Sequence, residues 1–297
     1  MRTIINHSMN KTLVGIFSGL AAASIWGGMY VVSKVVLNVI PPFTLLTMRL
    51  VLGILSLGIV IVLRPKTHMT RSKAWQIFLV GFVGYGVSLG FQFVGTKLST
   101  ASNGALVTSA TPAFILIFAP FLLAEKTTSR RIIALIISTL GVIAVIDPRN
   151  AELSPNLFWG NMSLLAAALT WALYSVLVRK VTQTADVVTS TAIMLAGGLP
   201  SGFILSVWEI KTQGMGTITP GIIGGILFLG IISTAIAMFL WNYAFAKLPA
   251  AVASLTFFAQ PVVGSLLGWM FLKESITPLF LFGGVLIAIG LVVSSTE

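Results

Sequence analysis

The chain has 297 residues, of which 57% are hydrophobic and only 8% are charged, and it contains no cysteine. This composition excludes a water-soluble domain, which needs far more charge to cover its surface, and it indicates a protein that folds in a bilayer. Without cysteine, disulfides and cysteine-ligated metals are excluded. The formal net charge of +11 lies in short segments between apolar runs, so orientation in the membrane explains it better than nucleic-acid binding.

Ten apolar runs, nearly free of charge, follow one another along the chain, and each can cross a bilayer as a helix. The first follows Arg2 and Lys11 and resembles a signal peptide, but it continues past Trp26 to Val32, which predicts a retained spanning helix. The connecting segments are short, which leaves no room for a soluble catalytic domain. The predicted spans are 13–37, 43–63, 75–96, 100–123, 130–147, 158–179, 187–208, 220–245, 250–272 and 277–295.

The lysines and arginines between these spans predict the orientation of the chain. Cytoplasmic connections carry an excess of basic residues, so we expect both termini in the cytoplasm and the protein in the cell inner membrane. With this orientation, the inner segments hold Arg2, Lys11, Arg64, Lys66, Arg71, Lys73, Lys126, Arg130, Arg131, Arg179, Lys180 and Lys247, and the outer ends and segments hold Lys34, Lys97, Arg149, Lys211 and Lys273.

The sequence also contains an internal repeat. Residues 97–126, KLSTASNGALVTSATPAFILIFAPFLLAEK, are similar to residues 247–275, KLPAAVASLTFFAQPVVGSLLGWMFLKES. A second pair is LAAASIW, ending at Trp26, and LAAALTW, ending at Trp171. A nearly constant offset between matching residues predicts a five-helix unit written twice. Further matches are Lys97 with Lys247, Pro112 with Pro261, Glu125 with Glu274, and Gly141 with Gly290.

Because each unit has an odd number of helices, the second must enter the membrane from the opposite side. The sequence therefore predicts an all-α membrane protein of ten transmembrane helices, built as two inverted five-helix repeats (residues 1–150 and 151–297) in one integrated membrane domain. Inverted repeats recur in secondary transporters, whose substrate sites lie near the midplane between the halves.

These motifs resemble those of the drug/metabolite transporter superfamily, and the chain is identified as a member of its ten-helix EamA type. The resemblance covers nearly the whole chain and rests on the repeated proline and tryptophan segments and on PPFTLLTMRLVLG at 41–53. It implies a central cavity lined mainly by spans 1, 3, 4, 6, 8 and 9, alternating access, and a small metabolite such as an amino acid as cargo. Arg49 takes the place of the family's second-span arginine, whereas the second half has Met194 or Leu195 there.

Pro112 and Pro261 lie inside predicted spans, where each removes a backbone donor and frees the carbonyl four residues earlier. In lipid, a freed carbonyl must find a partner or line a wet cavity. Two interpretations stand: kinks that serve packing, or hinges that bend spans 4 and 9 around a cavity. The second interpretation makes four residues candidates for the cavity lining: Thr108, Ser109, Phe257 and Gln260.

Two tryptophans, Trp26 and Trp171, lie near the middle of their spans, where an indole N–H needs a partner. Tyr30 and Tyr174 follow them at helical spacing, so each pair shares a helix face. These aromatics form either a packing core or a pocket for an apolar or cationic substrate. The remaining aromatic and polar candidates are Tyr85, Ser88 and Gln92, which form a stripe on span 3, and Asn242, the repeat partner of Gln92, for which a rim or gating role, direct binding and interhelical hydrogen bonding are all open.

Arg49 is the only charged residue well inside a span, and such residues are functional suspects, although it could also snorkel or cap a neighbouring helix. Glu125 and Glu274 are expected to be helix-end groups at opposite faces. No carboxylate lies in the middle of a span to carry protons, and His7 and His68 lie in predicted cytoplasmic segments, so no metal site is expected. No nucleotide-binding motif or pair of acids is present, so we expect neither a cofactor nor an enzyme.

The sequence thus predicts a secondary transporter or exporter of small metabolites, amino acids or related compounds, working by alternating access. Efflux of lipophilic or quaternary cations is an alternative, and a lipid scramblase or lipid enzyme is an alternative from another class. The expected partners are a small-molecule substrate and the lipid bilayer, without nucleic acid. Oligomeric state has no signature in the sequence.

Overall fold

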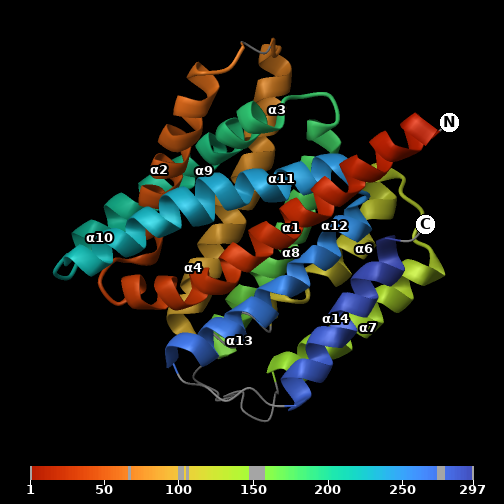
Figure 1. Ribbon diagram of the computed structural model, residues 1–297. Helices are drawn as coiled ribbons and strands as arrows, with labels where there is room; N and C mark the ends of the chain where they lie inside the picture. The colour runs from red at the N-terminus through yellow and green to blue at the C-terminus, as the bar shows by residue number, and fades with distance from the viewer. Residues whose placement is uncertain are drawn as a thin grey trace.

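The computed structural model is a bundle of helices (Figure 1), and it describes residues 2–65, 68–99, 104, 107–146, 158–272 and 278–295. Within these ranges every regular element is helical, as predicted. The elements are α1 (Arg2–Leu37), α2 (Pro42–Val62), α3 (Arg71–Gly81), η1 (Phe82–Ser88), α4 (Leu89–Leu98), α6 (Thr111–Leu123), α7 (Ser129–Ile146), α8 (Phe158–Thr182), α9 (Val187–Thr212), α10 (Pro220–Leu227), η4 (Phe228–Ile236), α11 (Ala237–Lys247), α12 (Ala250–Leu255), η5 (Thr256–Phe258), α13 (Ala259–Leu272) and α14 (Pro278–Ser295).

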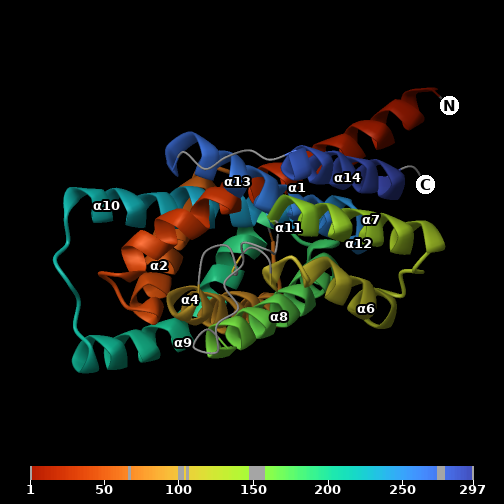
Figure 2. The same ribbon diagram turned by 90° about the horizontal axis from the view of Figure 1, so that it is seen from below.

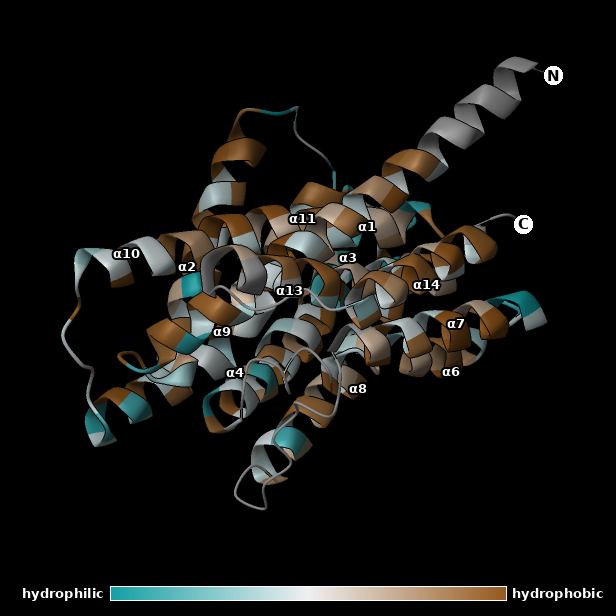
Figure 3. Ribbon diagram, turned by 60° about the horizontal axis from the view of Figure 1, so that its bottom comes forward, coloured by the Kyte–Doolittle hydropathy of each residue, from teal (hydrophilic) through white to brown (hydrophobic). Residues whose placement is uncertain are grey.

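Each predicted span corresponds to one helix or to consecutive helical elements, which confirms the predicted fold class. Among the described residues, six segments are long and apolar enough to cross a membrane by length and composition. Large apolar side chains face outward along the helices, such as Phe17, Phe121 and Ile204, and Figure 3 shows hydrophobic ribbon predominating there. An apolar exterior is what a lipid solvent requires.

Helix pairing follows the repeat. Helix α2 packs against α9, its counterpart in the second half, and α7 packs against its counterpart α14. The pairs α1–α11 and α1–α13 in one direction match α8–α4 and α8–α6 in the other. The start of α1 and the end of α14 lie at the same end of the bundle in Figures 1 and 2. An even number of crossings places both termini on one side.

Glycines allow the closest helix crossings. A Cβ atom added to Gly81 would lie 2.0 Å from the carbonyl oxygen of Met194, and one added to Gly197 would lie 2.1 Å from that of Phe78. The crossing of α3 with α9 therefore depends on residues without side chains. The repeat-related pair Gly141 and Gly290 does the same between α7 and α14, where added Cβ atoms would meet backbone oxygens at 2.7 and 2.8 Å.

The two repeated prolines differ from their prediction as bends inside continuous helices. Pro112 is the second residue of α6, which begins only at Thr111, and Pro261 is the third residue of α13, after the 3-10 turn η5. Proline is tolerated in the first turn because its missing N–H has no intrahelical partner there. Spans 4 and 9 are thus interrupted just before these prolines.

Spans 3 and 8 each contain a π-helical segment that the sequence analysis missed. Segment η1 separates α3 from α4, and η4 separates α10 from α11. Such segments are rare and often occur at functional sites, because a π-helical stretch leaves carbonyls free for side-chain donors. Both segments border the centre of the bundle, and η4 accepts hydrogen bonds from α1 and α2 there.

Candidate functional site

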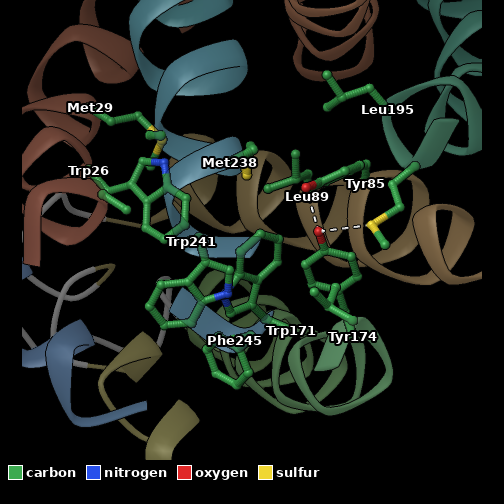
Figure 4. Close-up of a cluster of buried hydrophobic side chains, with 14 of the residues drawn as sticks. Trp26, Met29, Tyr85, Leu89, Trp171, Tyr174, Leu195, Met238, Trp241 and Phe245 are labelled. Atoms are coloured by element: carbon green, nitrogen blue, oxygen red, sulfur yellow. Dashed lines mark hydrogen bonds between the residues drawn. The ribbon is translucent and has the colours of Figure 1, made fainter. Parts of the chain in front are cut away.

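An aromatic cluster occupies the centre of the bundle (Figure 4). The repeat partners Trp26 and Trp171 meet edge to face there, with ring centroids 5.6 Å apart and planes at 83°. Trp241 packs against Trp26 at 5.3 Å, and Phe257 packs against Trp241 at 5.5 Å. Helices α1, α8 and α11 and the turn η5 therefore converge on one cluster. The repeat predicted that Trp26 and Trp171 are equivalent but did not predict that they touch.

A cavity lies beside this cluster, between the two halves. The cavity has a volume of about 20 Å³, which is enough for about one water molecule. Seven of the predicted candidates line it: Trp26, Ser88, Gln92, Thr108, Trp171, Phe257 and Gln260. The sequence analysis missed six lining residues. Five are apolar residues that carry no signal inside an apolar run, and the sixth, Thr111, is polar: Met29, Leu89, Ala167, Ala168, Met238 and Thr111.

Four buried polar atoms on lining residues have no hydrogen-bond partner within the part of the chain that the structure describes. They are Gln92 Oε1, Thr111 Oγ1, Trp171 Nε1 and Gln260 Nε2. Buried polar groups are nearly always paired, so each such group calls for a reason. Their common position on one cavity suggests that they serve a ligand. The first two belong to the first half of the chain and the last two to the second.

Other polar groups around the cavity are fixed. The Tyr30 hydroxyl lies 3.1 Å from Thr108 Oγ1 and accepts from Gln92 Nε2 at 2.9 Å. Tyr30 is thus in contact with two lining residues. Ser88 donates to the Ala167 carbonyl at 2.8 Å and so joins η1 to α8. Ser109 is buried but does not line the cavity.

A second polar network lies deeper, apart from the cavity. Tyr174 donates to Asn242 Oδ1 at 2.7 Å, and its oxygen is also hydrogen-bonded to the Tyr85 hydroxyl, as Figure 4 shows. Asn242 Nδ2 donates to Tyr85 at 3.2 Å and to Thr191 Oγ1 at 3.0 Å. Asn242 is fully buried and does not line the cavity. The network joins spans 3, 6, 7 and 8 through satisfied hydrogen bonds.

Arg49 is fully buried in α2 and neither snorkels nor caps a helix end. Its Nε donates to the Leu229 carbonyl at 3.2 Å and to Thr234 Oγ1 at 3.0 Å, and its Nη2 donates to Ser233 Oγ at 3.2 Å. The guanidinium also lies 4.9 Å from the centre of the Phe93 ring. Arg49 therefore holds the π-helical segment η4, to which Trp26 also binds, since its Nε1 donates to the Ser233 carbonyl at 3.0 Å.

Two basic residues missed as site elements close opposite ends of the bundle. Lys34 donates to carbonyls at the end of α4, including Thr96 at 3.0 Å. Arg179, which follows Lys34 at the same offset as the tryptophans, donates to the Phe245 carbonyl at 3.1 Å and to that of Leu248. Arg179 also pairs with Glu125, as a helix-end role for this carboxylate predicts. Glu274 lies outside the described residues.

The comparison with family models decides the classification. The EamA-like transporter family matches residues 13–146 and again residues 158–296. The chain belongs to the EamA-like transporter family. Its two matches coincide with the two predicted repeats, and they make the protein a multi-pass membrane protein of a transporter family.

Individual relatives agree with this assignment. This chain is 28% identical over 294 residues to a probable amino-acid metabolite efflux pump of Salmonella typhimurium, and the match covers 94% of this chain and 93% of the relative. It is 23% identical over 285 residues to the uncharacterized transporter YoaV of Bacillus subtilis, covering 95% and 96%. A solved crystal structure aligns with a TM-score of 0.78 over 94% of this chain and 96% of that one, at 20% identity, which supports the fold.

Proposed function

We propose that this EamA-family chain exports small amphipathic metabolites, amino acids or related compounds, by alternating access of its two inverted halves around the central cavity. The observation that carries the proposal is the set of four unpartnered polar atoms on that cavity, contributed by both halves. Three sit on groups that can donate a hydrogen bond, and Gln92 Oε1 accepts one. A zwitterion with a carboxylate and an ammonium group supplies both kinds of partner.

The aromatic wall suits the apolar part of such a substrate. Trp26, Trp171 and Phe257 present ring surface to the same cavity, and most ligand sites combine apolar walls with a few placed polar groups. A cavity with room for about one water corresponds to a closed stage of the cycle. Movement of α6 and α13 at the interruptions before Pro112 and Pro261 would enlarge it, which keeps both prolines as hinge candidates.

The orientation belongs to the same proposal. Twelve basic residues in one set of connecting segments against five in the other support cytoplasmic termini and a place in the cell inner membrane. The similarity to a probable amino-acid metabolite efflux pump supports export as the direction.

The test is counterflow in proteoliposomes with a panel of radiolabelled metabolites, with and without a pH gradient. We expect exchange of at least one amino acid or related compound, saturable and lost in the Trp171→Ala variant. Protein-free liposomes are the control. Absence of exchange for every small solute would contradict the proposal.

A different class of function has one observation in its favour. A larger cavity of about 780 Å³ is lined by residues of α2, the α8–α9 connection, η4 and α11, with apolar walls and Arg64 and Lys247 among its lining. A cavity of this size, with apolar walls and basic residues, also suits a lipid with its acyl chain and headgroup. Lipid flipping in the same proteoliposomes, without metabolite exchange, is the result that would favour this alternative.

A further inference from the structure

We infer that the central cavity selects substrates that carry a negatively charged group, and that Arg49 supplies the positive charge from behind the cavity wall. This inference rests on the proposed transport function and narrows its substrate class. It favours carboxylate-bearing metabolites over the lipophilic or quaternary cations that an aromatic pocket alone would accept.

The first step is the missing counter-charge of Arg49. Its hydrogen-bond and ring partners among the described residues are all neutral, namely a carbonyl, two hydroxyls and the Phe93 ring. Its Nη1 has no hydrogen-bond partner in the part of the chain that the structure describes, although the residue is fully buried. A buried cation in a membrane is costly and almost always paired or functional.

The described carboxylates are all engaged elsewhere. Glu125 pairs with Arg179, and Asp186 lies 3.7 Å from Arg64. Glu209 is buried but accepts from the amide and hydroxyl of Thr44, at 2.8 and 3.1 Å. Within the described ranges, therefore, no carboxylate forms an ion pair with Arg49. The field of this charge is not cancelled by a direct partner, and it extends into the low-dielectric centre of the bundle.

Ser233 connects this charge to the cavity. Its hydroxyl accepts from Arg49 Nη2, and its carbonyl accepts from Trp26 Nε1, which belongs to a lining residue. Arg49 thus lies one residue behind the wall. It acts as a positioning residue for η4 and Trp26 and as a source of positive potential, without touching the substrate in this closed arrangement.

The lining itself agrees with an anionic ligand. The unpartnered groups of Thr111, Trp171 and Gln260 all include a hydrogen-bond donor, and donors favour a carboxylate. The aromatic rings attract a cation at close range, whereas the full charge of Arg49 acts over a longer distance. The donors of the lining and the charge of Arg49 act together in favour of an anionic group and offset the attraction of the rings for cations.

The test uses the fact that the chain has no cysteine. A single cysteine replaces the lining residue Ala168, and a control cysteine replaces Thr217, an exposed residue. Each is reacted in the full-length protein with two methanethiosulfonates, one carrying a sulfonate and one a trimethylammonium group. Because the closed cavity has room for about one water molecule, both reagents reach position 168 only when the cavity opens. The ratio of the anionic to the cationic reaction rate cancels this shared step and reports the local potential. Failure of both reagents to react at position 168 would overturn the inference as well.

We expect this ratio to be at least about tenfold higher at position 168 than at position 217, because unlike charges attract strongly at low dielectric. Arg49→Gln should bring the two ratios together, whereas Arg49→Lys keeps the charge and should preserve the difference. Arg64→Gln, at an exposed arginine after α2, is the matched control and should leave the ratio unchanged.

Equal ratios at the two positions would overturn the inference, and that measurement does not require the Arg49→Gln variant to fold. An unchanged ratio in a folded Arg49→Gln variant would overturn it as well. The assay measures potential rather than flux. A chain that exchanges metabolites can therefore fail it, and a chain without exchange can pass it, which separates this inference from the proposed function.

Discussion

The first half of the chain places Arg49 in its second span, whereas the second half has an uncharged residue, Met194 or Leu195, at the corresponding position. Arg49 donates hydrogen bonds into η4 of the opposite half, while the Met194 sulfur lies 3.6 Å from the Tyr174 hydroxyl within its own half. The tryptophans also differ, because Trp26 has an N–H partner and Trp171 has none among the residues that the structure describes. The repeat therefore supplies a symmetric scaffold, and unequal side chains make the site asymmetric.

The largest expected effect comes from breaking the close contact between α3 and α9. Gly81→Ala would place a Cβ atom 2.0 Å from the Met194 carbonyl oxygen, and the backbone there cannot easily move away. We expect a loss of about 3 kcal/mol or more in the free energy of unfolding, measured by thermal unfolding in detergent. A Cβ atom added to Gly58 would have no neighbouring atom within 4 Å, so Gly58→Ala should stabilise the helix by about 0.5–1 kcal/mol. Equal behaviour of the two variants would contradict this packing.

The next largest effect is a difference in stability between variants of the repeat partners Gln92 and Asn242. Asn242→Ala leaves the buried hydroxyls of Tyr85, Tyr174 and Thr191 with fewer partners, and we expect a loss of about 2 kcal/mol. Gln92→Ala removes one hydrogen bond at the cavity, to Tyr30, and should cost less than about 1 kcal/mol while reducing exchange. Urea unfolding and counterflow measure the two effects. A larger stability loss for Gln92→Ala would reverse the assigned roles.

The basic helix-end residues should also differ. Arg179→Ala removes an ion pair with Glu125 as well as bonds to two carbonyls, and we expect a loss of about 2 kcal/mol. Lys34→Ala removes only contacts with carbonyls among the described residues and should cost about 1 kcal/mol. Thermal unfolding with the Glu125→Ala, Arg179→Ala double variant isolates the ion pair. Purely additive losses would mean that this pair adds nothing.

The smallest stability effect concerns the central tryptophans. Trp26→Phe removes the bond to the Ser233 carbonyl and should lower the free energy of unfolding by about 1 kcal/mol. Trp171→Phe removes an N–H that has no partner among the described residues, so it should cost less stability than Trp26→Phe but weaken the apparent affinity for an exchanged metabolite about fivefold. Unfolding curves and counterflow titrations distinguish the two. If Trp26→Phe kept its stability but lost affinity for the metabolite, the indole N–H of Trp26 rather than that of Trp171 would serve the substrate.

Much of the fold could be predicted, because lipid imposes a simple rule on the sequence. A spanning helix needs a long apolar run, so ten runs and a constant offset predicted ten helices in two copies. The interruptions before Pro112 and Pro261 and the π-helical segments could not be predicted. They depend on which carbonyls find donors from other helices, such as Arg49 on Leu229, and a single sequence does not contain that information.

The candidate site divides along the same line. The sequence by itself identified Trp26, Trp171, Gln92 and Gln260 as unusual, because polar and indole groups inside an apolar run need partners. Only the tertiary structure decided which of them have partners. In the described ranges, Asn242 has its hydrogen bonds in a buried network, the indole N–H of Trp171 has no partner at the cavity, and Arg49 lies behind Ser233 without an ion pair. Hydrophobicity is local and can be read along the chain, whereas pairing of buried polar groups depends on helices distant in sequence.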